Sequence, residues 1–334
     1  MVTKTFICRG PEGAYDPFRN LAVEKYLTFH VKEGQCILFL WQNRRTVVIG
    51  RNQNAWKECN IDALAADGGH LARRLSGGGA VFHDLGNLNF SFCVRREDYD
   101  VDRQLEVIRR ALRREGIEAE KSGRNDLLAE GRKFSGNAFY KSGDFCCHHG
   151  TIMIDVNRKL IGRYLNVPER KLISKGIASV QSRVINLKEL CPALTVERLC
   201  GSLREAFSEV YECVSADIGM PDTAQIREDA AWFASREWLS GTKTSFTHEL
   251  EGDFAWGGTQ VLLQVEEGKI ADCRIHSDAM DQEEILQIAA ALRGCLYEKR
   301  AVLDRLGMLM AQQTGAERLE MLSDIRNLLK KELN

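Results

Sequence analysis

Hydrophobic and polar residues follow two periodicities along the chain, which predicts a mixture of strands and helices. In one alternating stretch, Leu88, Phe90 and Phe92 fall on one face of a predicted strand, with polar residues on the other. Residues 36–41 and 46–50 are two β-rich stretches separated by a short polar segment, which favours a hairpin. We therefore expect an α/β (α+β) fold with a sheet in the amino-terminal part.

Helical stretches lie between these strands. Asp16 followed by Pro17 is a typical helix start, with an N-cap acceptor and a proline in the first turn. Leu105, Ile108 and Leu112 recur at helical spacing. The other side of that helix carries four arginines, at positions 109, 110, 113 and 114. Such a basic face is either solvated or a docking surface for an acidic partner, and the sequence leaves both interpretations open.

A second hairpin is predicted further along the chain. Residues 126–128 and 132–139 are strand-like and are joined by a Glu-Gly turn. Strict alternation would place Lys133 and Ser135 on one face of the second strand, and Phe134 on the other. Lys133 is therefore expected on a rigid element and not on a loop.

The pattern changes beyond residues 240–242, where we place a domain boundary. Three strand-like stretches follow, at residues 246–250, 257–265 and 269–276. Asp281 and Glu284 then form a capping-box start to a helix. The prediction is a first domain of residues 1–245 and a small α+β domain of residues 246–334 that shows no obvious chemistry.

The composition and charge of the chain are typical of a globular protein. The chain has 334 residues, of which 44% are hydrophobic and 28% charged, and its formal net charge is -1. This balance is ordinary for a globular protein, and it gives no reason to expect nucleic acid or an anionic membrane as partner. No apolar stretch approaches the ~18 residues that a membrane span requires.

The cysteines point to a reducing compartment. The chain has 11 cysteines, and none of them forms a Cys-x-x-Cys pair typical of zinc or redox sites. The amino terminus shows no secretory signal, so we expect free thiols in the cytoplasm. His148 and His149 are adjacent on a predicted strand and point in opposite directions, which makes them a poor chelate.

Three successive glycines, Gly77, Gly78 and Gly79, follow Arg74 and Ser76. Bare backbone amides beside a guanidinium and a hydroxyl could cradle a phosphate or carboxylate. A tight hairpin with basic neighbours would need the same glycines. The triplet alone does not decide between these two interpretations.

Four motifs in this order resemble the signatures of the lipoate–protein ligase A family. They are Arg73–Asp84, Gly131–Ala138, His148–Thr151 and the segment Ser174–Val184. The resemblance covers most of residues 1–245, and the tail resembles, more weakly, the accessory domain of the two-domain bacterial ligases. It implies a mixed-sheet catalytic domain similar to that of biotin protein ligases.

The family resemblance implies activation of lipoate with ATP and Mg²⁺ to lipoyl-AMP, followed by transfer to a carrier lysine. The implied carriers are the lipoyl domains of 2-oxoacid dehydrogenase E2 subunits and the glycine-cleavage H protein. The enzyme would be a cytoplasmic monomer serving lipoate salvage, with no nucleic-acid or membrane partner.

The resemblance also implies site residues. Lys133 would be catalytic, since a compact ammonium can bridge the lipoate carboxylate and the α-phosphate as two anions are brought together. Asp126 would hold Mg²⁺, and His149 would lie near the acyl pocket. The remaining positions that match nucleotide- or acyl-binding positions are Arg74, Ser76, Gly77, Gly78, Gly79, Ala80, Val81, Phe82, Asn125 and Ala138.

Rival activities share the same predicted fold. A lipoyl or octanoyl transferase would use a cysteine thioester and no ATP, but residues 124–128, which precede the Gly-Arg-Lys motif, contain no cysteine. Cys147 is the nearest cysteine, and we interpret it as a packing residue. An amidotransferase moving lipoyl groups between proteins, and a non-catalytic lipoyl-binding paralogue, also stay open.

Overall fold

The computed structural model describes residues 1–123, 125–166, 184–240 and 246–333. Its contacts divide the chain into two compact units. The first comprises Met1–Ile49, Ala55–Arg74 and Ala80–Leu239, and the second comprises Gly50–Asn54, Leu75–Gly79 and Ser240–Asn334. The predicted division at residue 245 stays a prediction, and two short loop segments from the amino-terminal half group with the carboxy-terminal residues.

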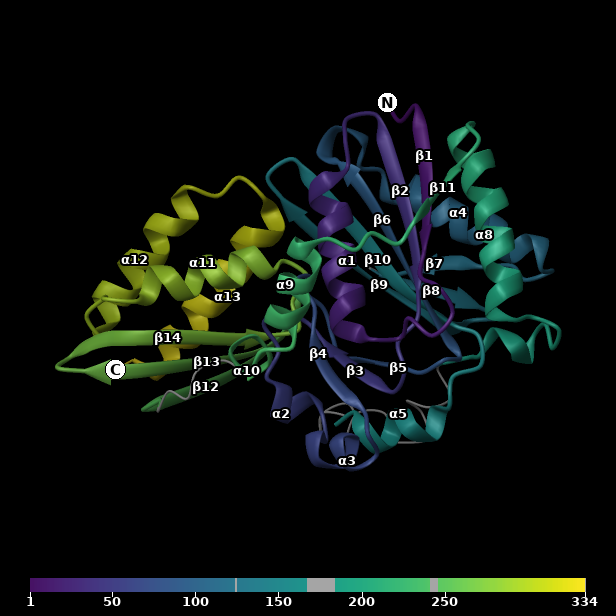
Figure 1. The fold of residues 1–334 in the computed structure, drawn as a ribbon. Coiled ribbons are helices and arrows are strands. Elements are labelled where there is room, and N and C mark those ends of the chain that lie inside the picture. Colours follow the sequence, from purple (N-terminus) through teal and green to yellow (C-terminus); the bar gives the residue numbers. More distant parts are fainter. Residues whose placement is uncertain (124, 167–183, 241–245, 334) are drawn as a thin grey trace. The chain divides into compact units, whose positions relative to one another are not determined.

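The first unit is built on a mixed eight-stranded sheet with the order β11-β1-β2-β6-β10-β9-β8-β7 (Figure 1). Its strands are β1 (Lys4–Arg9), β2 (Gln35–Trp41), β6 (Asn87–Arg95), β7 (Glu120–Ser122), β8 (Asp126–Ala129), β9 (Arg132–Ser142), β10 (Phe145–Met153) and β11 (Ala216–Gly219). β1 runs parallel to β2 and β11, and the other neighbours are antiparallel. The mixed sheet and the separate α+β tail confirm the predicted fold class.

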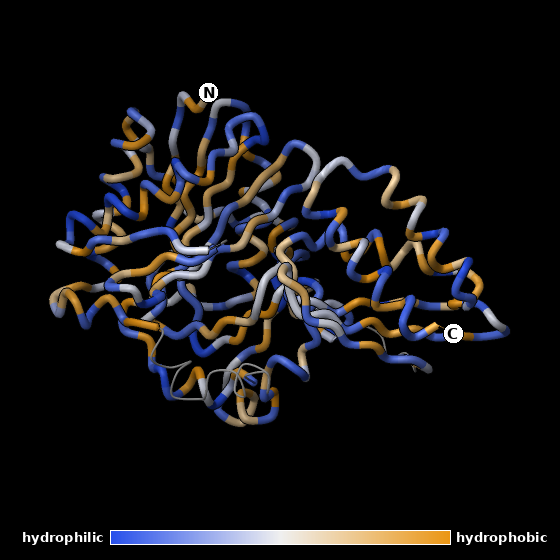
Figure 2. Tube along the Cα trace, turned by 180° about the vertical axis from the view of Figure 1, so that it is seen from behind, coloured by the Kyte–Doolittle hydropathy of each residue, from blue (hydrophilic) through white to orange (hydrophobic). Residues whose placement is uncertain are grey.

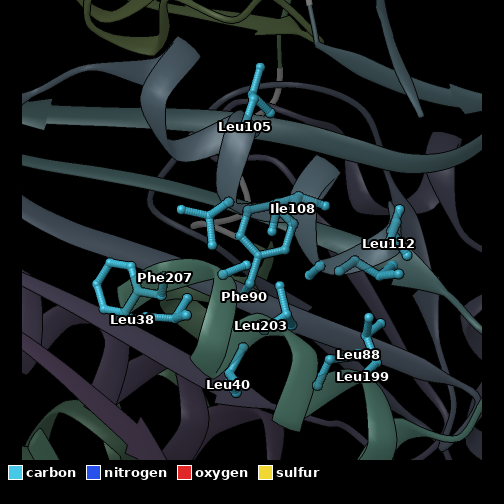
Figure 3. Close-up of a cluster of buried hydrophobic side chains, with 14 of the residues drawn as sticks. Leu38, Leu40, Leu88, Phe90, Leu105, Ile108, Leu112, Leu199, Leu203 and Phe207 are labelled. Atoms are coloured by element: carbon cyan, nitrogen blue, oxygen red, sulfur yellow. The ribbon is translucent and has the colours of Figure 1, made fainter. Parts of the chain in front are cut away.

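Helices cover both faces of this sheet. The helices of residues 1–240 are α1 (Pro17–His30), α2 (Ala55–Glu58), α3 (Ile61–Ala66), α4 (Val101–Arg114), α5 (Arg158–Tyr164), α8 (Val196–Tyr211), α9 (Ala224–Phe233) and α10 (Arg236–Ser240), with 3-10 turns at Arg96–Asp98 and Leu187–Glu189. On one face, α4 and α8 bury a core that contains Leu38, Phe90, Ile108, Leu203 and Phe207 (Figure 3). On the other face, α1 packs against β2, β6 and β10.

The alternation of apolar and polar residues in β6 correctly predicted which side chains enter the core. Leu88, Phe90 and Phe92 all enter the core under α4 and α8, as predicted. Asn89 and Ser91, which lie between them, are also buried, at 1% and 0% exposure. Because α1 covers that face, β6 carries its polar residues inward, and their polar atoms must find partners within the protein.

The predicted hairpin of residues 36–41 and 46–50 is wrong. β3 (Thr46–Ile49) belongs to a separate sheet with the order β4-β3-β5, together with β4 (His70–Arg73) and β5 (Val81–His83). The segment between β2 and β3 carries the chain from one sheet to the other. Asn43 in this segment is fully buried and accepts a hydrogen bond from Asn20 of α1, so its polar character reflects an internal contact and not an exposed turn.

β8 and β9 form the predicted hairpin, with Glu130 and Gly131 both at positive φ (49° and 70°) in the turn. The register, however, shifts between Leu127 and Leu128, so Leu127 pairs with Ser135 and Leu128 with Lys133. Consecutive residues of β8 face opposite sides of the sheet. Lys133 and Ser135 therefore face opposite sides, and their predicted common face is wrong because β9 carries an extra residue here.

The second unit contains an antiparallel sheet with the order β12-β13-β14 and three helices that share one hydrophobic core with it (Figure 1). Its elements are β12 (His248–Phe254), β13 (Gly257–Glu266), β14 (Lys269–Ser277), α11 (Gln282–Leu292), α12 (Lys299–Ala311) and α13 (Ala316–Glu332). Hydrophobic and hydrophilic stretches alternate along these helices (Figure 2), and the hydrophobic residues form a core of their own. The three predicted strands and the Asp281 N-cap are confirmed. The predicted capping box is wrong in its second half, because neither carboxylate oxygen of Glu284 has a hydrogen-bond partner among the described residues.

The arginines of α4 form ion pairs within the protein. The pairs are Arg109 and Arg110 with Glu106, Arg113 with Glu118, and Arg114 with Glu205 and Glu209. This face is therefore balanced by acidic residues of α4, α8 and the loop after α4, which favours the solvated interpretation over a docking surface. No helix within the described ranges is both long and apolar enough to cross a membrane.

Candidate functional site

The sheet face beneath α1 carries a buried chain of polar side chains. Glu24 of α1 accepts hydrogen bonds from Ser91 of β6 and from Nδ1 of His149 of β10, the latter at 2.8 Å. Ser91 accepts a further bond of 3.0 Å from the indole Nε1 of Trp41. These residues are 0–7% exposed. The predicted site residue His149 is thus fixed in place by a carboxylate from another element.

His83 and Arg74 lie in the same electrostatic environment. Burial, followed by the nearby charges of Arg74 and His149, lowers the pKa of His83 to about 3, so its ring is neutral at physiological pH. His83 Nδ1 lies 3.2 Å from the Asn43 amide, and its Nε2 is buried with no hydrogen-bond partner among the described residues. This ring nitrogen can therefore take part in one further hydrogen bond.

Arg74 is a buried cation at the end of β4. Its side chain is 7% exposed, and Nη1 donates to the Val48 carbonyl at 3.2 Å. Burial lowers the pKa of Arg74 to about 10, and the negative charge of Glu24 acts in the opposite direction. The guanidinium therefore stays charged at neutral pH, which suits a position that must attract an anion.

Lys133 and Asp126 form an ion pair on neighbouring strands, with 2.6 Å between Nζ and Oδ1. Both side chains are about one-third exposed, at 38% and 33%. Asp126 pairs with Gly136, and a Cβ at Gly136 would lie 3.1 Å from the Lys133 Nζ. The register shift brings Lys133 to the same face as Asp126, and the small Gly136 leaves room for its side chain.

The face of the sheet that carries Asp126 and Lys133 also carries His149. Ala138 pairs with His149 across β9 and β10, and Gly136 lies two residues before Ala138 in β9. Directly opposed residues of an antiparallel pair point to the same side. The predicted residues Asp126, Lys133, Ala138 and His149 therefore share one face of the sheet.

His148 and Asn125 occupy different positions. His148 points to the α4 face, where its two ring nitrogens each lie 2.9 Å from an amide oxygen, of Gln104 and of Asn137. This confirms that the two histidines point in opposite directions, and burial lowers the pKa of His148 to about 3. Asn125 joins β8 to β9, since its amide donates to the Asn137 carbonyl at 2.8 Å.

The glycine triplet belongs to the second unit, and its members differ. A Cβ at Gly77 would lie 2.3 Å from the Ala279 carbonyl oxygen, so packing requires a glycine there. Gly78 has a φ of 85° and donates its N–H to the same carbonyl at 3.1 Å. Gly79 is exposed, and a Cβ there would meet nothing within 4 Å. Packing alone therefore does not explain the third glycine.

The segments around the triplet are tied together by main-chain hydrogen bonds. Arg51 N donates to the Ser76 carbonyl at 2.9 Å, and Ser277 N donates to the Asn52 carbonyl at 3.0 Å. The Asn52 amide donates in turn to the Gln282 carbonyl at 3.1 Å. Two loops of the amino-terminal half are thus held by residues at the end of β14 and the start of α11.

The remaining predicted positions lie at the start of β5. Ala80 and Val81 are partly buried, and Val81 pairs with Val48. Phe82 is 6% exposed and packs with its ring centroid 5.4 Å from that of Tyr164. Phe82 therefore has a core role, and only its main chain could contact a ligand.

Several buried residues of this site were not predicted from the sequence. They are Glu24, Trp41, His83 and Ser91. His83 lies inside the glycine-rich motif and could have been proposed from it. There is less indication in the sequence that Glu24 is buried. The only hint is that Glu24 lies close to the buried apolar residues Leu21 and Val23 in α1. The fourth motif, residues 174–184, lies almost wholly outside the described residues.

Two family models match separate parts of the chain. Residues 16–208 match the model of the lipoyl protein ligase A/B catalytic domain. The chain belongs to this family. Residues 243–325 match the model of the bacterial lipoate protein ligase C-terminus, which makes it a two-domain member.

Solved structures of lipoate–protein ligases share this fold. The crystal structure of P. falciparum LipL1 in complex with lipoate is 27% identical, with a TM-score of 0.85 over 98% of this chain and 99% of that chain. A bi-partite lipoate protein ligase from Thermoplasma acidophilum, studied with its E2 lipoyl domain, is 24% identical with a TM-score of 0.64, over 73% and 100%. A lipoate-protein ligase A bound with ATP is 24% identical with a TM-score of 0.61, over 72% and 99%.

Proposed function

We propose that this protein is an ATP-dependent, AMP-forming lipoate–protein ligase that acts in lipoate salvage in the cytoplasm, as a monomer. It would activate lipoate to lipoyl-AMP and transfer the lipoyl group to a lysine of a carrier domain. Its carriers would be the lipoyl domains of 2-oxoacid dehydrogenase E2 subunits and the glycine-cleavage H protein. The proposal is supported by the family, by the lipoate- and ATP-bound relatives, and by one feature of the sheet.

That feature is the position of Lys133. Lys133 lies near the start of β9, its ammonium is ion-paired to Asp126, and its side chain shares a face of the sheet with His149. Attack of a carboxylate on the α-phosphorus of ATP brings two anions together, so a cation held in advance lowers the barrier. A rigid strand holds this cation without the entropy cost of ordering a loop.

In the activation step, a lipoate carboxylate oxygen attacks the α-phosphorus and pyrophosphate leaves. Lys133 would stay protonated and hold the carboxylate and the α-phosphate together by charge-assisted hydrogen bonds. In the transfer step, the carrier amine attacks the acyl carbonyl and AMP leaves. The ammonium would then stabilise the negative charge that develops on the carbonyl oxygen.

The acyl chain would extend along the face toward His149, where the neutral His83 and Trp41 supply apolar and hydrogen-bonding surface. Arg74 would contribute its charge to nucleotide binding. Gly79, whose side-chain position is open, is the residue of the triplet best placed for close approach by a ligand.

Asp126 suits a magnesium ion that arrives with the nucleotide. Mg²⁺ is typically bound through one or two carboxylates plus substrate phosphates, and Asp126 offers one partly exposed carboxylate beside Lys133. Among the described residues, Asp126 is not part of any cluster of three metal-ligating side chains. Bound there, the ion would neutralise phosphate charge and favour departure of pyrophosphate.

The cysteines argue against the thioester transferase. A nucleophilic cysteine needs a lowered pKa and access to substrate. All eleven thiols are free, and every cysteine with a shifted pKa is shifted upward. For Cys147, the nearest to the motifs, the causes are its contact with Cys93 and its burial.

The donor requirement tests the proposal. Purified protein is incubated with an apo lipoyl domain and either lipoate plus ATP and Mg²⁺, or an octanoyl-carrier donor without ATP. Mass spectrometry of the domain should show a lipoyl adduct with the first mixture and no octanoyl adduct with the second. Modification with the second mixture and none with the first would identify a transferase and overturn the proposal.

A further inference from the structure

Glu24, Cys147 and His149 form a buried group of potential metal ligands under α1. A carboxylate oxygen, a thiol sulfur and an imidazole nitrogen from these residues all lie within 4.8 Å of one another. Their residues are 6%, 2% and 7% exposed. Cys147 and His149 are two residues apart in β10 and share a face, while Glu24 approaches from the helix above.

The kinds of ligand atom point to a thiophilic divalent cation. Thiolate, imidazole and carboxylate together are typical of Zn²⁺, whereas Mg²⁺ and Ca²⁺ take oxygen ligands. Zinc–ligand distances of about 2.0–2.3 Å place neighbouring ligand atoms roughly 3–4 Å apart. The present 2.8 Å between His149 Nδ1 and the Glu24 carboxylate therefore requires only a small expansion.

Charge balance also favours a divalent ion at this buried position. A buried charge is costly unless it is paired, and one carboxylate plus one thiolate neutralise a doubly charged cation. Cys93 pairs directly with Cys147 across β6 and β10 and contacts its thiol, so a second sulfur lies beside the group. Ser91 supplies a hydroxyl next to Glu24.

We propose that Glu24, Cys147 and His149 form a binding site for one thiophilic divalent cation of the Zn²⁺ type. Binding releases the Cys147 thiol proton to solvent and replaces the Glu24–His149 hydrogen bond with two metal–ligand bonds. No oxidation or reduction is involved. The hydrogen bond between His149 and Glu24 holds these two ligand groups close to each other.

One consequence rests on the proposed function. If the acyl chain of lipoate ends near His149, the cation and lipoate compete for this position. Zinc would then inhibit lipoate activation, and a chelator would restore it. The site itself is tested without any activity measurement, so failure of one proposal is distinguishable from failure of the other.

Cobalt spectroscopy of the full-length protein tests the site. Co²⁺ is added under anaerobic conditions, and the near-ultraviolet thiolate-to-cobalt charge-transfer band is recorded. The matched variants are Cys147→Ser and Cys146→Ser. Cys146 is equally buried, but its side chain lies in the core on the opposite face of the sheet. Thermal unfolding monitored by circular dichroism checks that each variant folds.

The expected result is a band that saturates at one equivalent of Co²⁺, is displaced by Zn²⁺, persists in Cys146→Ser and is lost in Cys147→Ser. His149→Gln should keep the band but weaken Co²⁺ binding at least tenfold, which preserves the test if Cys147→Ser does not fold. No band in the unmodified protein, a band that survives in folded Cys147→Ser, or unchanged affinity in folded His149→Gln would each overturn the proposal.

Discussion

At the scale of single residues, the glycine triplet shows how one motif can combine different physical requirements. Gly77 makes room for the Ala279 carbonyl, and Gly78 takes a positive φ, whereas Gly79 is exposed with open space around it. Only the first two are explained by the fold. A sequence pattern cannot separate these roles, because each requires the same absence of a side chain.

Gly77→Ala and Gly79→Ala should therefore behave differently. We expect Gly77→Ala to lower the free energy of unfolding by about 1–3 kcal/mol, because the new methyl group would overlap a carbonyl oxygen. Gly79→Ala should change it by less than about 0.5 kcal/mol. Urea unfolding measures both values. Equal effects would show that packing does not distinguish the two glycines.

Glu24 is the acceptor that two buried donors share. Glu24→Ala would leave the Ser91 hydroxyl and His149 Nδ1 without their partner. We expect a loss of about 2 kcal/mol in the free energy of unfolding, within the cost of unsatisfied buried donors. Glu12→Ala, at an exposed position, is the control and should change stability by less than about 0.5 kcal/mol. Comparable stability of the two variants would contradict this interpretation.

At the scale of elements, the start of α11 contains an unusual carboxyl group. Glu284 is completely buried, and neither carboxylate oxygen has a hydrogen-bond partner among the described residues. Burial raises its pKa from 4.5 to about 6, and Arg318, 3.8 Å away, only partly compensates. The Asp281 cap is present, since Asp281 accepts the Glu284 N–H at 3.0 Å.

The raised pKa gives a defined pH dependence. The folded protein binds this proton more tightly than the unfolded chain, so stability falls as pH rises from 4.5 to about 6 and then stays lower. Glu284→Gln removes the buried charge and should increase stability at pH 8 by about 2 kcal/mol, with little effect near pH 4.5. Glu283→Gln, one residue earlier, is the control. A stability difference between Glu284→Gln and the unmodified protein that does not vary with pH would contradict this account.

The same scale shows what the sequence could and could not predict. Alternation in β6 and helical spacing in α4 identified the core residues, because each face is buried against one partner layer. Alternation does not reveal which sheet a strand joins, so β2 and β3 were wrongly paired. A β-bulge also reverses the direction of the side chains that follow it, and the sequence pattern does not reveal the bulge in β9. This is why Lys133 and Ser135 were wrongly predicted to share a face of the sheet.

At the scale of the whole molecule, ordered motifs were more informative than composition. The ordinary composition and a net charge of -1 only excluded classes of protein, whereas the motifs predicted the family that the comparisons show. The candidate site was predicted in part. Motif residues came from three strands, but Glu24, Trp41 and Ser91 lie outside the motifs and became visible only when α1 was placed on the sheet.

The two compact units are not continuous segments of the sequence. The loops Gly50–Asn54 and Leu75–Gly79 group with Ser240–Asn334, through main-chain hydrogen bonds to Ser277 and Ala279. A boundary read from a change in sequence pattern cannot include such segments, because they are separated from the second unit by more than 150 residues of chain. The glycine-rich motif therefore depends on residues of the carboxy-terminal part for its conformation.

The proposed function requires that the protein activates lipoate with ATP and that Lys133 is essential for this step. Its most direct test is lipoate-dependent exchange of labelled pyrophosphate into ATP by the unmodified protein, Lys133→Ala and Lys141→Ala. Lys141 lies on the same strand but is exposed, with its ammonium 4.9 Å from the Tyr99 ring centroid. We expect exchange in the unmodified protein and in Lys141→Ala, and a loss of at least about 100-fold in Lys133→Ala, the size of effect that removing one transition-state donor produces. Exchange that survives in Lys133→Ala, or that is absent from the unmodified protein, would contradict the account.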